Sequence, residues 1–187
     1  MPGQIKIDDG SGNYTILTNG GSLGSDKTIT IPNTTGTMAL TSDSFGKVLQ
    51  VVGATSSTEQ STTSTSYIDI TNLTVSITPS ATTSKVLILY TDTTMTNRSN
   101  DVSSGNVFIQ LLRDSTSIAI KEGGFYDAAG GNGSKSLYNG EALVHLDSPS
   151  STSAITYKIQ IKASSSTTVK SQYNNDTASI IAMEIGA

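Results

Sequence analysis

The sequence predicts an all-β protein in which a short-strand N-terminal segment precedes a jelly-roll-like β-sandwich. No stretch sustains the apolar period of an amphipathic helix. Short β-branched or apolar runs instead alternate with clusters of Gly, Ser, Asn and Asp, which favour turns. Serine and threonine form close to a third of the 187 residues, whereas aromatic residues are only 5%. Frequent Thr, Ile and Val indicate a folded chain, because β-branched side chains pack well on a pleated sheet.

Residues 1–44 form the first expected domain, and their strands are very short. We expect strands at 4–7, 14–18, 27–31 and 37–40, separated by turns rich in Gly, Asn and Pro. So few apolar side chains cannot build a private core. This segment must therefore pack against its own C-terminal domain, identical chains around a symmetry axis, or another protein surface. The boundary is expected within 41–46.

Residues 45–187 carry stronger strand signals. Leu73, Val75 and Ile77 alternate with hydroxyl residues, and Pro79 then ends that strand because it donates no backbone hydrogen bond. The runs 85–90 and 107–112 are apolar on both faces, which predicts central strands covered on two sides.

The remaining strands of this domain follow from similar patterns. Candidates fall at 47–53, 67–78, 85–92, 106–113, 117–121, 136–146, 154–162, 167–173 and 179–185. Eight or nine strands in one domain fit a two-sheet sandwich, most simply a jelly roll. Residues 54–66, nearly all Ser and Thr, and residues 125–136, rich in Gly, are expected to be surface loops.

Composition excludes several classes of protein. A net charge of −4 gives no electrostatic footprint for nucleic acid. The absence of cysteine excludes disulfides, cysteine-based zinc sites and thiol catalysis. The first ten residues do not resemble a signal peptide, and the longest apolar run, Val86–Tyr90, is far shorter than the ~18 residues of a membrane span. We expect a soluble chain made in the cytosol, without membrane insertion.

Candidate catalytic residues are few. The one histidine, His145, is the sole base for a Ser-His-Asp arrangement and lies on the same strand face as Leu143. It is read as a strand histidine, packed or half-exposed; the alternative places three copies at a threefold axis, binding a metal or sensing pH. No pair of acids stands out for glycosidase chemistry, and the run Asp8–Asn13 only partly matches a calcium loop. We therefore expect no enzyme activity, cofactor or metal.

Several stretches resemble known virion proteins. Residues 21–40 resemble a strand, Pro, turn and Gly-Thr module of bacteriophage tail-fibre and appendage proteins. Six further stretches are similar to virion fibre-like proteins of marine phages, particularly those infecting cyanobacteria: 46–52, 84–90, 112–114, 146–149, 156–161 and 181–185. The resemblance covers nearly the whole chain and rests on strand signatures.

That resemblance implies a homotrimeric fibre or knob located in the virion. Residues 1–44 would attach to other phage virion proteins, and residues 45–187 would form a jelly-roll head without catalytic residues. The physical reading agrees, because a cysteine-free, hydroxyl-rich β protein suits assembly in host cytoplasm and release by lysis. The last strand, 179–185, is apolar on both faces and could line the trimer axis.

The leading functional hypothesis is a tail fibre or receptor-binding appendage that adsorbs to a host-surface glycan or protein. Its contacts would come from loops at 93–105 and 122–136, because Tyr, Ser, Asn and Gly combine rigid contact area with adaptable hydrogen bonds. The residues expected to face the receptor are Asn97, Arg98, Tyr126, Asp127, Asn132 and Tyr138. One alternative is a capsid decoration or head-fibre protein that stabilises the coat, and another is a polysaccharide depolymerase.

Overall fold

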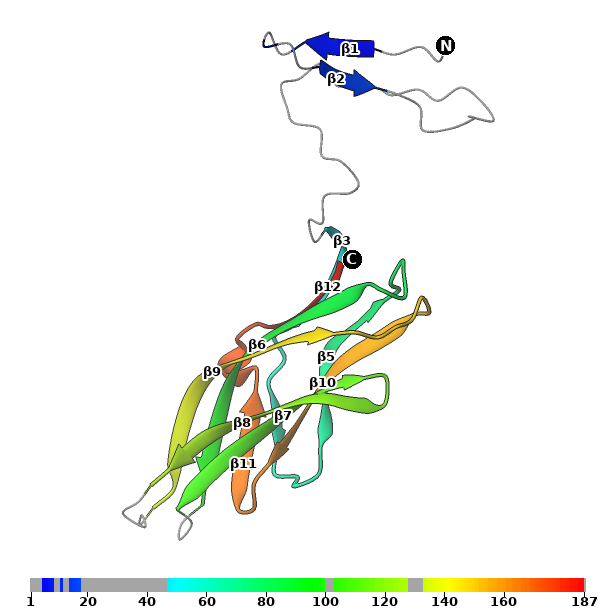
Figure 1. The fold of residues 1–187 in the computed structure, drawn as a ribbon. Helices are drawn as coiled ribbons and strands as arrows, with labels where there is room; N and C mark the ends of the chain where they lie inside the picture. The colour runs from blue at the N-terminus through cyan, green and yellow to red at the C-terminus, as the bar shows by residue number, and fades with distance from the viewer. Residues whose placement is uncertain are drawn as a thin grey trace. The chain divides into compact units, whose positions relative to one another are not determined.

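The structure, a computed structural model, describes residues 5–8, 11, 14–17, 47–99, 103–127 and 133–186 (Figure 1). The chain divides into two compact units, Met1–Asp43 and Ser44–Ala187. In the first unit, β1 (Ile5–Asp8) pairs antiparallel with β2 (Tyr14–Leu17). The strands predicted at 27–31 and 37–40 lie outside the described residues.

The second unit is a two-sheet antiparallel sandwich, which confirms the predicted all-β fold (Figure 1). Its strands are β3 (Val48–Ser56), β4 (Gln60–Thr62), β5 (Ile68–Ile77), β6 (Lys85–Arg98), β7 (Ser104–Arg113), β8 (Thr116–Tyr126), β9 (Lys135–Asp147), β10 (Ile155–Ala163), β11 (Thr167–Ser171) and β12 (Ala178–Ile185). One 3₁₀ turn, η1 (Tyr173–Asn175), joins the last two.

The pairing of these strands is that of a jelly roll. In the first sheet, called here the β6 sheet, β6 pairs with β9 along one side. Along its other side, β6 pairs first with β12 and then with β11. Beyond them, β3 pairs with β12 and β4 pairs with β11. The other, the β7 sheet, has the order β5-β10-β7-β8. Pairing is nested: β7 with β8, β6 with β9, β5 with β10, and β3/β4 with β11/β12. This is the order of a long antiparallel ribbon folded over into two Greek keys.

The core lies between the two sheets. It is built from the inward residues of alternating strands, so that successive side chains of β10, for example, are buried and half-buried in turn. The largest apolar members are Leu73, Ile77, Ile88, Tyr90, Ile109, Leu111, Tyr157, Ile159, Ile161 and Ile180. Each such aliphatic side chain stabilises the fold by roughly 1.5–3 kcal/mol on burial. As expected from their apolar runs, β6 and β7 are interior strands of their sheets.

Two loop predictions are wrong. Residues 93–98 continue β6, and β3 and β4 occupy much of the expected loop 54–66. In both cases most of the inward side chains are polar, mainly hydroxyls such as Ser56 and Thr62, so apolar alternation does not reveal the strand. Thr94, Thr96 and Arg98 are all buried. The loop expected over 122–136 is likewise shortened, because β8 runs to Tyr126.

The sandwich has two chemically different ends. At the end called here the tether end, Val48 pairs with Ile185 and Ile185 with Lys85, so the chain enters β3 beside the last strand. At the loop end, Arg98 pairs with both Lys135 and Thr167. The last residues of β6, β8 and β10 and the first residues of β7, β9 and β11 therefore lie at the end of the sandwich opposite to the entry of the chain (Figure 1).

A buried carboxylate fastens the tether end. Glu184 of β12 is 1% exposed and accepts hydrogen bonds from the Ser80 hydroxyl (2.6 Å), the Ser80 backbone N–H (2.7 Å) and the Gln50 amide (2.7 Å). Gln50 also donates to the Thr78 carbonyl. Burial alone would raise the pKa of Glu184, but the hydrogen bonds from Ser80 and Gln50 outweigh it and lower the pKa to about 2.

This pKa predicts a specific acid response. A depressed pKa contributes stability that is present above the unfolded-state value of 4.5 and is lost as pH falls from there toward about 2. We expect the unfolding free energy of the wild-type chain to fall more steeply across that window than that of Glu184→Gln, measured by urea denaturation at each pH. Parallel slopes for the two proteins would contradict the assignment.

Candidate functional site

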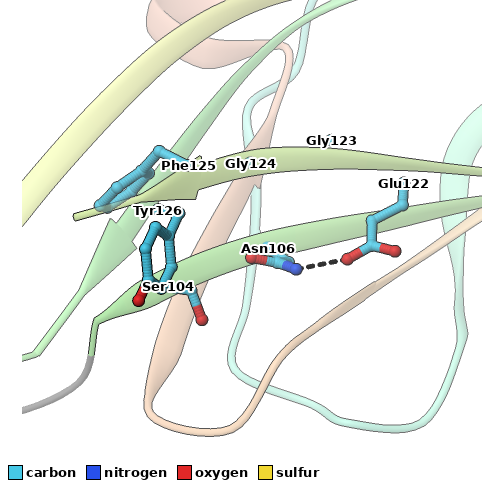
Figure 2. A pocket seen from close by; sticks show the side chains of 7 residues that line it. All are labelled: Ser104, Asn106, Glu122, Gly123, Gly124, Phe125 and Tyr126. Carbon is cyan, nitrogen blue, oxygen red and sulfur yellow. Dashed lines mark hydrogen bonds between the residues drawn. The ribbon is translucent and has the colours of Figure 1, made fainter. Parts of the chain in front are cut away.

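A solvent-open hollow lies on the outer face of the β7 sheet, close to the loop end. Its volume is about 520 Å³. Its lining comes from two adjacent strands, β7 and β8: Ser104, Asn106, Glu122, Gly123, Gly124, Phe125 and Tyr126 (Figure 2). It is therefore built on paired strands rather than on a long loop, so the hydrogen-bonded ladder holds its side chains in register.

The register of β7 and β8 explains why the hollow exists. Ser104 pairs with Tyr126 and Asn106 pairs with Gly124. Residues directly opposite each other in a ladder point to the same face, so a side chain at position 124 would stand between Glu122 and Tyr126. Gly124 has none, and it adopts a φ of +140°, a conformation that favours glycine. A Cβ there would lie 2.3 Å from the Gly105 carbonyl oxygen, so the gap is enforced by the backbone.

The hollow combines an aromatic ring with neutral and acidic polar groups. The Tyr126 side chain is 73% exposed, and Figure 2 shows it beside Ser104. The Asn106 amide donates a hydrogen bond to the Glu122 carboxylate, which holds both groups at the opposite side of the hollow (Figure 2). An exposed phenol ring offers an apolar face with a polar edge, and the hydroxyl, amide and carboxylate offer donors and acceptors. This set suits a neutral, polyhydroxylated ligand such as a glycan.

Behind this hollow, the loop end is held by a buried charge. Arg98 is 0% exposed and pairs with Asp127 at 3.0 Å, while its guanidinium carbon lies 5.9 Å from the centre of the Phe125 ring. Lys135 also pairs with Asp127, which joins the start of β9 to the end of β8. Arg98 and Asp127, both named above as receptor-facing, thus form an internal support of the loop end: Arg98 is fully buried, and the Asp127 side chain is 14% exposed.

A second, smaller hollow of about 260 Å³ opens nearby at the loop end. Asn97 of β6 lines it together with hydroxyl residues from the ends of β4, β6 and β11 and from the β10–β11 connection: Thr63, Ser99, Ser166, Thr167 and Thr168. The Asn97 amide donates to the Ser136 hydroxyl at 2.7 Å. Because this hollow has no aromatic member among its lining residues, it offers hydrogen bonds but no stacking surface.

Tyr138 lies on the other sheet. Its ring packs against Tyr173 of η1, with centroids 4.9 Å apart. Lys170 lies over the Tyr173 ring and pairs with Glu59 at 2.6 Å. The hydrogen bond from Lys170, together with one from the Asn174 backbone N–H, lowers the pKa of Glu59. The predicted receptor-facing residues therefore fall on both sheets. Asn97 and Tyr138 lie on the same face of β6 and β9, where Met95 pairs with Tyr138 and Asn97 with Ser136, whereas Tyr126 lies in β8 of the β7 sheet.

Other predicted site features have plainer outcomes. Asn132 lies outside the described residues. His145 is half-buried in β9, on the same side of the strand as buried Leu143. Within residues 47–99, 103–127 and 133–186, no three His, Cys, Asp or Glu side chains gather into a candidate metal site. The described part of the chain likewise contains no helix of the length and apolarity needed to cross a membrane.

Among the lining residues of the larger hollow, the sequence prediction named only Tyr126. Ser104, Glu122 and Gly124 fall inside the predicted contact ranges 93–105 and 122–136, whereas Asn106 lies outside them. A usable signal was present, because two consecutive glycines, Gly123 and Gly124, interrupt an otherwise regular strand just before an aromatic pair. Glycine within a strand often marks a place where a ligand or another backbone approaches closely.

Comparisons with known proteins add little to this picture. No family model and no curated protein matches the chain. Among solved structures, similar chains include the Gx strain of infectious bursal disease virus (11% identity, TM-score 0.31, 80% of this chain and 42% of that chain) and the D431N mutant VP2 protein of the same virus (14% identity, TM-score 0.34, 91% and 42%).

The VP2 subviral particle of that virus is similar at 13% identity and a TM-score of 0.34, over 82% of this chain and 42% of that chain. The present chain spans less than half the length of these structures. Values this low carry no argument about function, so the jelly-roll architecture rests on the strand pairing itself. The resemblance to marine phage fibre proteins stays a prediction.

Proposed function

We propose that this protein is a structural component of a phage virion, a homotrimeric tail fibre or receptor-binding appendage without enzyme activity. Residues 1–44 attach it to other virion proteins, and the jelly-roll head recognises a host-surface glycan or protein. The resemblance of the strand signatures to phage fibre proteins supports the class, and the layout of the head supports the division of labour.

The observation that carries the proposal is the placement of the hollow. The chain enters the head at the tether end, where Val48 pairs with Ile185, whereas the hollow with Tyr126 lies near the opposite end. An appendage fixed through its N-terminal segment needs its recognition surface at the far end of the head, where a host surface is accessible. The aromatic and polar lining has the chemistry to hold a sugar there.

The binding surface can be tested with immobilised bacterial lipopolysaccharide and capsular polysaccharide as probes. We expect the full-length chain to be retained on at least one of these surfaces, and Tyr126→Ala to reduce its affinity about tenfold or more, because an exposed aromatic anchor supplies much of the contact energy. Glu122→Gln should weaken binding less, since the amide keeps an acceptor oxygen for Asn106.

Tyr138→Ala is the matched control, because Tyr138 is also an exposed strand tyrosine, 56% accessible, but lies on the other sheet. Retained affinity in this variant together with loss in Tyr126→Ala supports the proposal. Loss in Tyr138→Ala alone, or retention by no surface in the panel, would overturn it. The bound polysaccharide should keep its chain length during incubation, and shortening would identify a depolymerase.

A further inference from the structure

We infer that the outer face of the β6 sheet is the surface through which copies of this chain associate. This deepens the proposed function, because it assigns the subunit contacts of the proposed trimer. The face is a continuous apolar area made by four strands. Its exposed members are Leu49, Val51, Val144 and Leu146, with half-buried Leu87, Leu89, Ile181 and Met183 between them.

Strand register shows that these side chains are contiguous. Leu146 pairs with Leu87, Leu87 with Met183, and Met183 with Val51, so one apolar row crosses the sheet from β9 to β3. A second row joins Val144, Leu89 and Ile181. Neighbouring strands lie about 4.8 Å apart, so the rows reach across roughly 15–20 Å of surface. Their inward neighbours, such as Ile88 and Ile180, already fill the core.

Charge argues for a second copy as the occupant. Neither row contains a charged side chain, so two such faces can meet without removing an ion from water. Lys85 borders the rows at the tether end, as expected for the polar rim of an interface. The outer face of the β7 sheet is different: Lys158 pairs with Asp69 there at 3.0 Å, which is typical of a solvated surface.

The apolar face extends to both outer strands of this sheet, β9 and β3, so one copy can meet a different neighbour at each side. The row through Leu87 ends at Leu146 on one side and at Val51 on the other, and both are more than half exposed. If the β9 part of one copy packs against the β3 part of a second, and the β3 part of the first against a third copy, the contact is heterologous and closes by rotation into a trimer. The loop end of each head, with its hollow, stays free in such an arrangement because the face is on the other sheet.

The test measures the mass of the full-length chain by sedimentation equilibrium. The wild-type chain should sediment as a trimer of the 19.4 kDa protomer. The double variant Val144→Glu/Leu146→Glu should fall about threefold in mass, because it places carboxylates in the contact. Ile120→Glu is the matched control: Ile120 is 61% exposed on the outer face of the β7 sheet, and this variant should keep the wild-type mass.

Circular dichroism checks that each variant is folded. Should the double variant misfold, a spin label on Leu146→Cys offers a second measurement, because the chain has no native cysteine. The inference predicts a dipolar distance between labels on neighbouring copies, and its absence would contradict the inference. A wild-type chain that sediments as a monomer overturns the inference; the face would then be covered by residues 1–43 or by another virion protein. An unchanged mass in the folded double variant also overturns it. Because polysaccharide retention is measured separately, failure of this inference and failure of the proposed recognition are distinguishable.

Discussion

Asp92→Ala is expected to lower the free energy of unfolding by about 4 kcal/mol. Asp92 is 4% exposed and accepts hydrogen bonds from the Tyr90 hydroxyl (2.8 Å), the Ser171 hydroxyl and the Gln172 backbone N–H (2.9 Å). Its removal leaves three buried donors without an acceptor. The substitution also removes the acceptor of the Gln172 N–H, and Gln172 directly precedes η1. Tyr173 of η1 should therefore pack less tightly against Tyr138. Urea denaturation measures the loss of stability.

Asp92→Asn is the matched control for this prediction. Burial raises the pKa of Asp92, since desolvation penalises its carboxylate more than its hydrogen bonds favour it. The neutral amide keeps one acceptor oxygen and avoids burying a charge, so its cost should be less than half that of Asp92→Ala. Equal losses for both variants, or a loss below about 1 kcal/mol for alanine, would show that the donors find other partners.

Arg98→Ala is expected to lower the free energy of unfolding by about 3 kcal/mol and to weaken binding at the hollow as well. The fully buried side chain fills the interior beneath Phe125 and pairs with Asp127, so its removal leaves a cavity and weakens the junction of β8 with β9. Tyr126 lies between Phe125 and Asp127 in the chain, and its position should become less defined. Thermal unfolding and retention on the polysaccharide surfaces measure the two effects.

The control is Arg113→Ala, which removes an arginine that also pairs with an aspartate. Arg113 is 30% exposed and contacts Asp147 at 2.9 Å, away from the loop end. Because the Arg113 charge is partly hydrated and the Tyr157 hydroxyl still donates to Asp147 at 2.7 Å, the loss of Arg113 should cost about 1 kcal/mol and leave binding unchanged. If the two variants lose similar stability, or if Arg98→Ala binds as well as the wild-type chain, Arg98 is not the internal support described above.

Strands with apolar alternation could be predicted from the sequence with little error. The run around Leu73, Val75 and Ile77 and the strand after Ile155 lie where the pattern places them, because one buried face imposes a period of two. The polar half of β6 was missed for the converse reason. Its inward residues Asp92, Thr94, Thr96 and Arg98 are polar but buried, so their burial leaves no apolar signal. Asp92 and Arg98 take partners from outside β6, namely Ser171 and Asp127.

By itself, the sequence determined the all-β class, the sandwich of strands in the second unit and the exclusion of cysteine chemistry, because composition and local period reflect which residues can face a core. Only the tertiary structure decided which side chains share a surface. Asn106 and Glu122 meet across paired strands, and Val51 and Leu146 join one apolar face although they are distant in the chain. Strand order and register create these neighbours, and both depend on contacts between residues far apart in sequence.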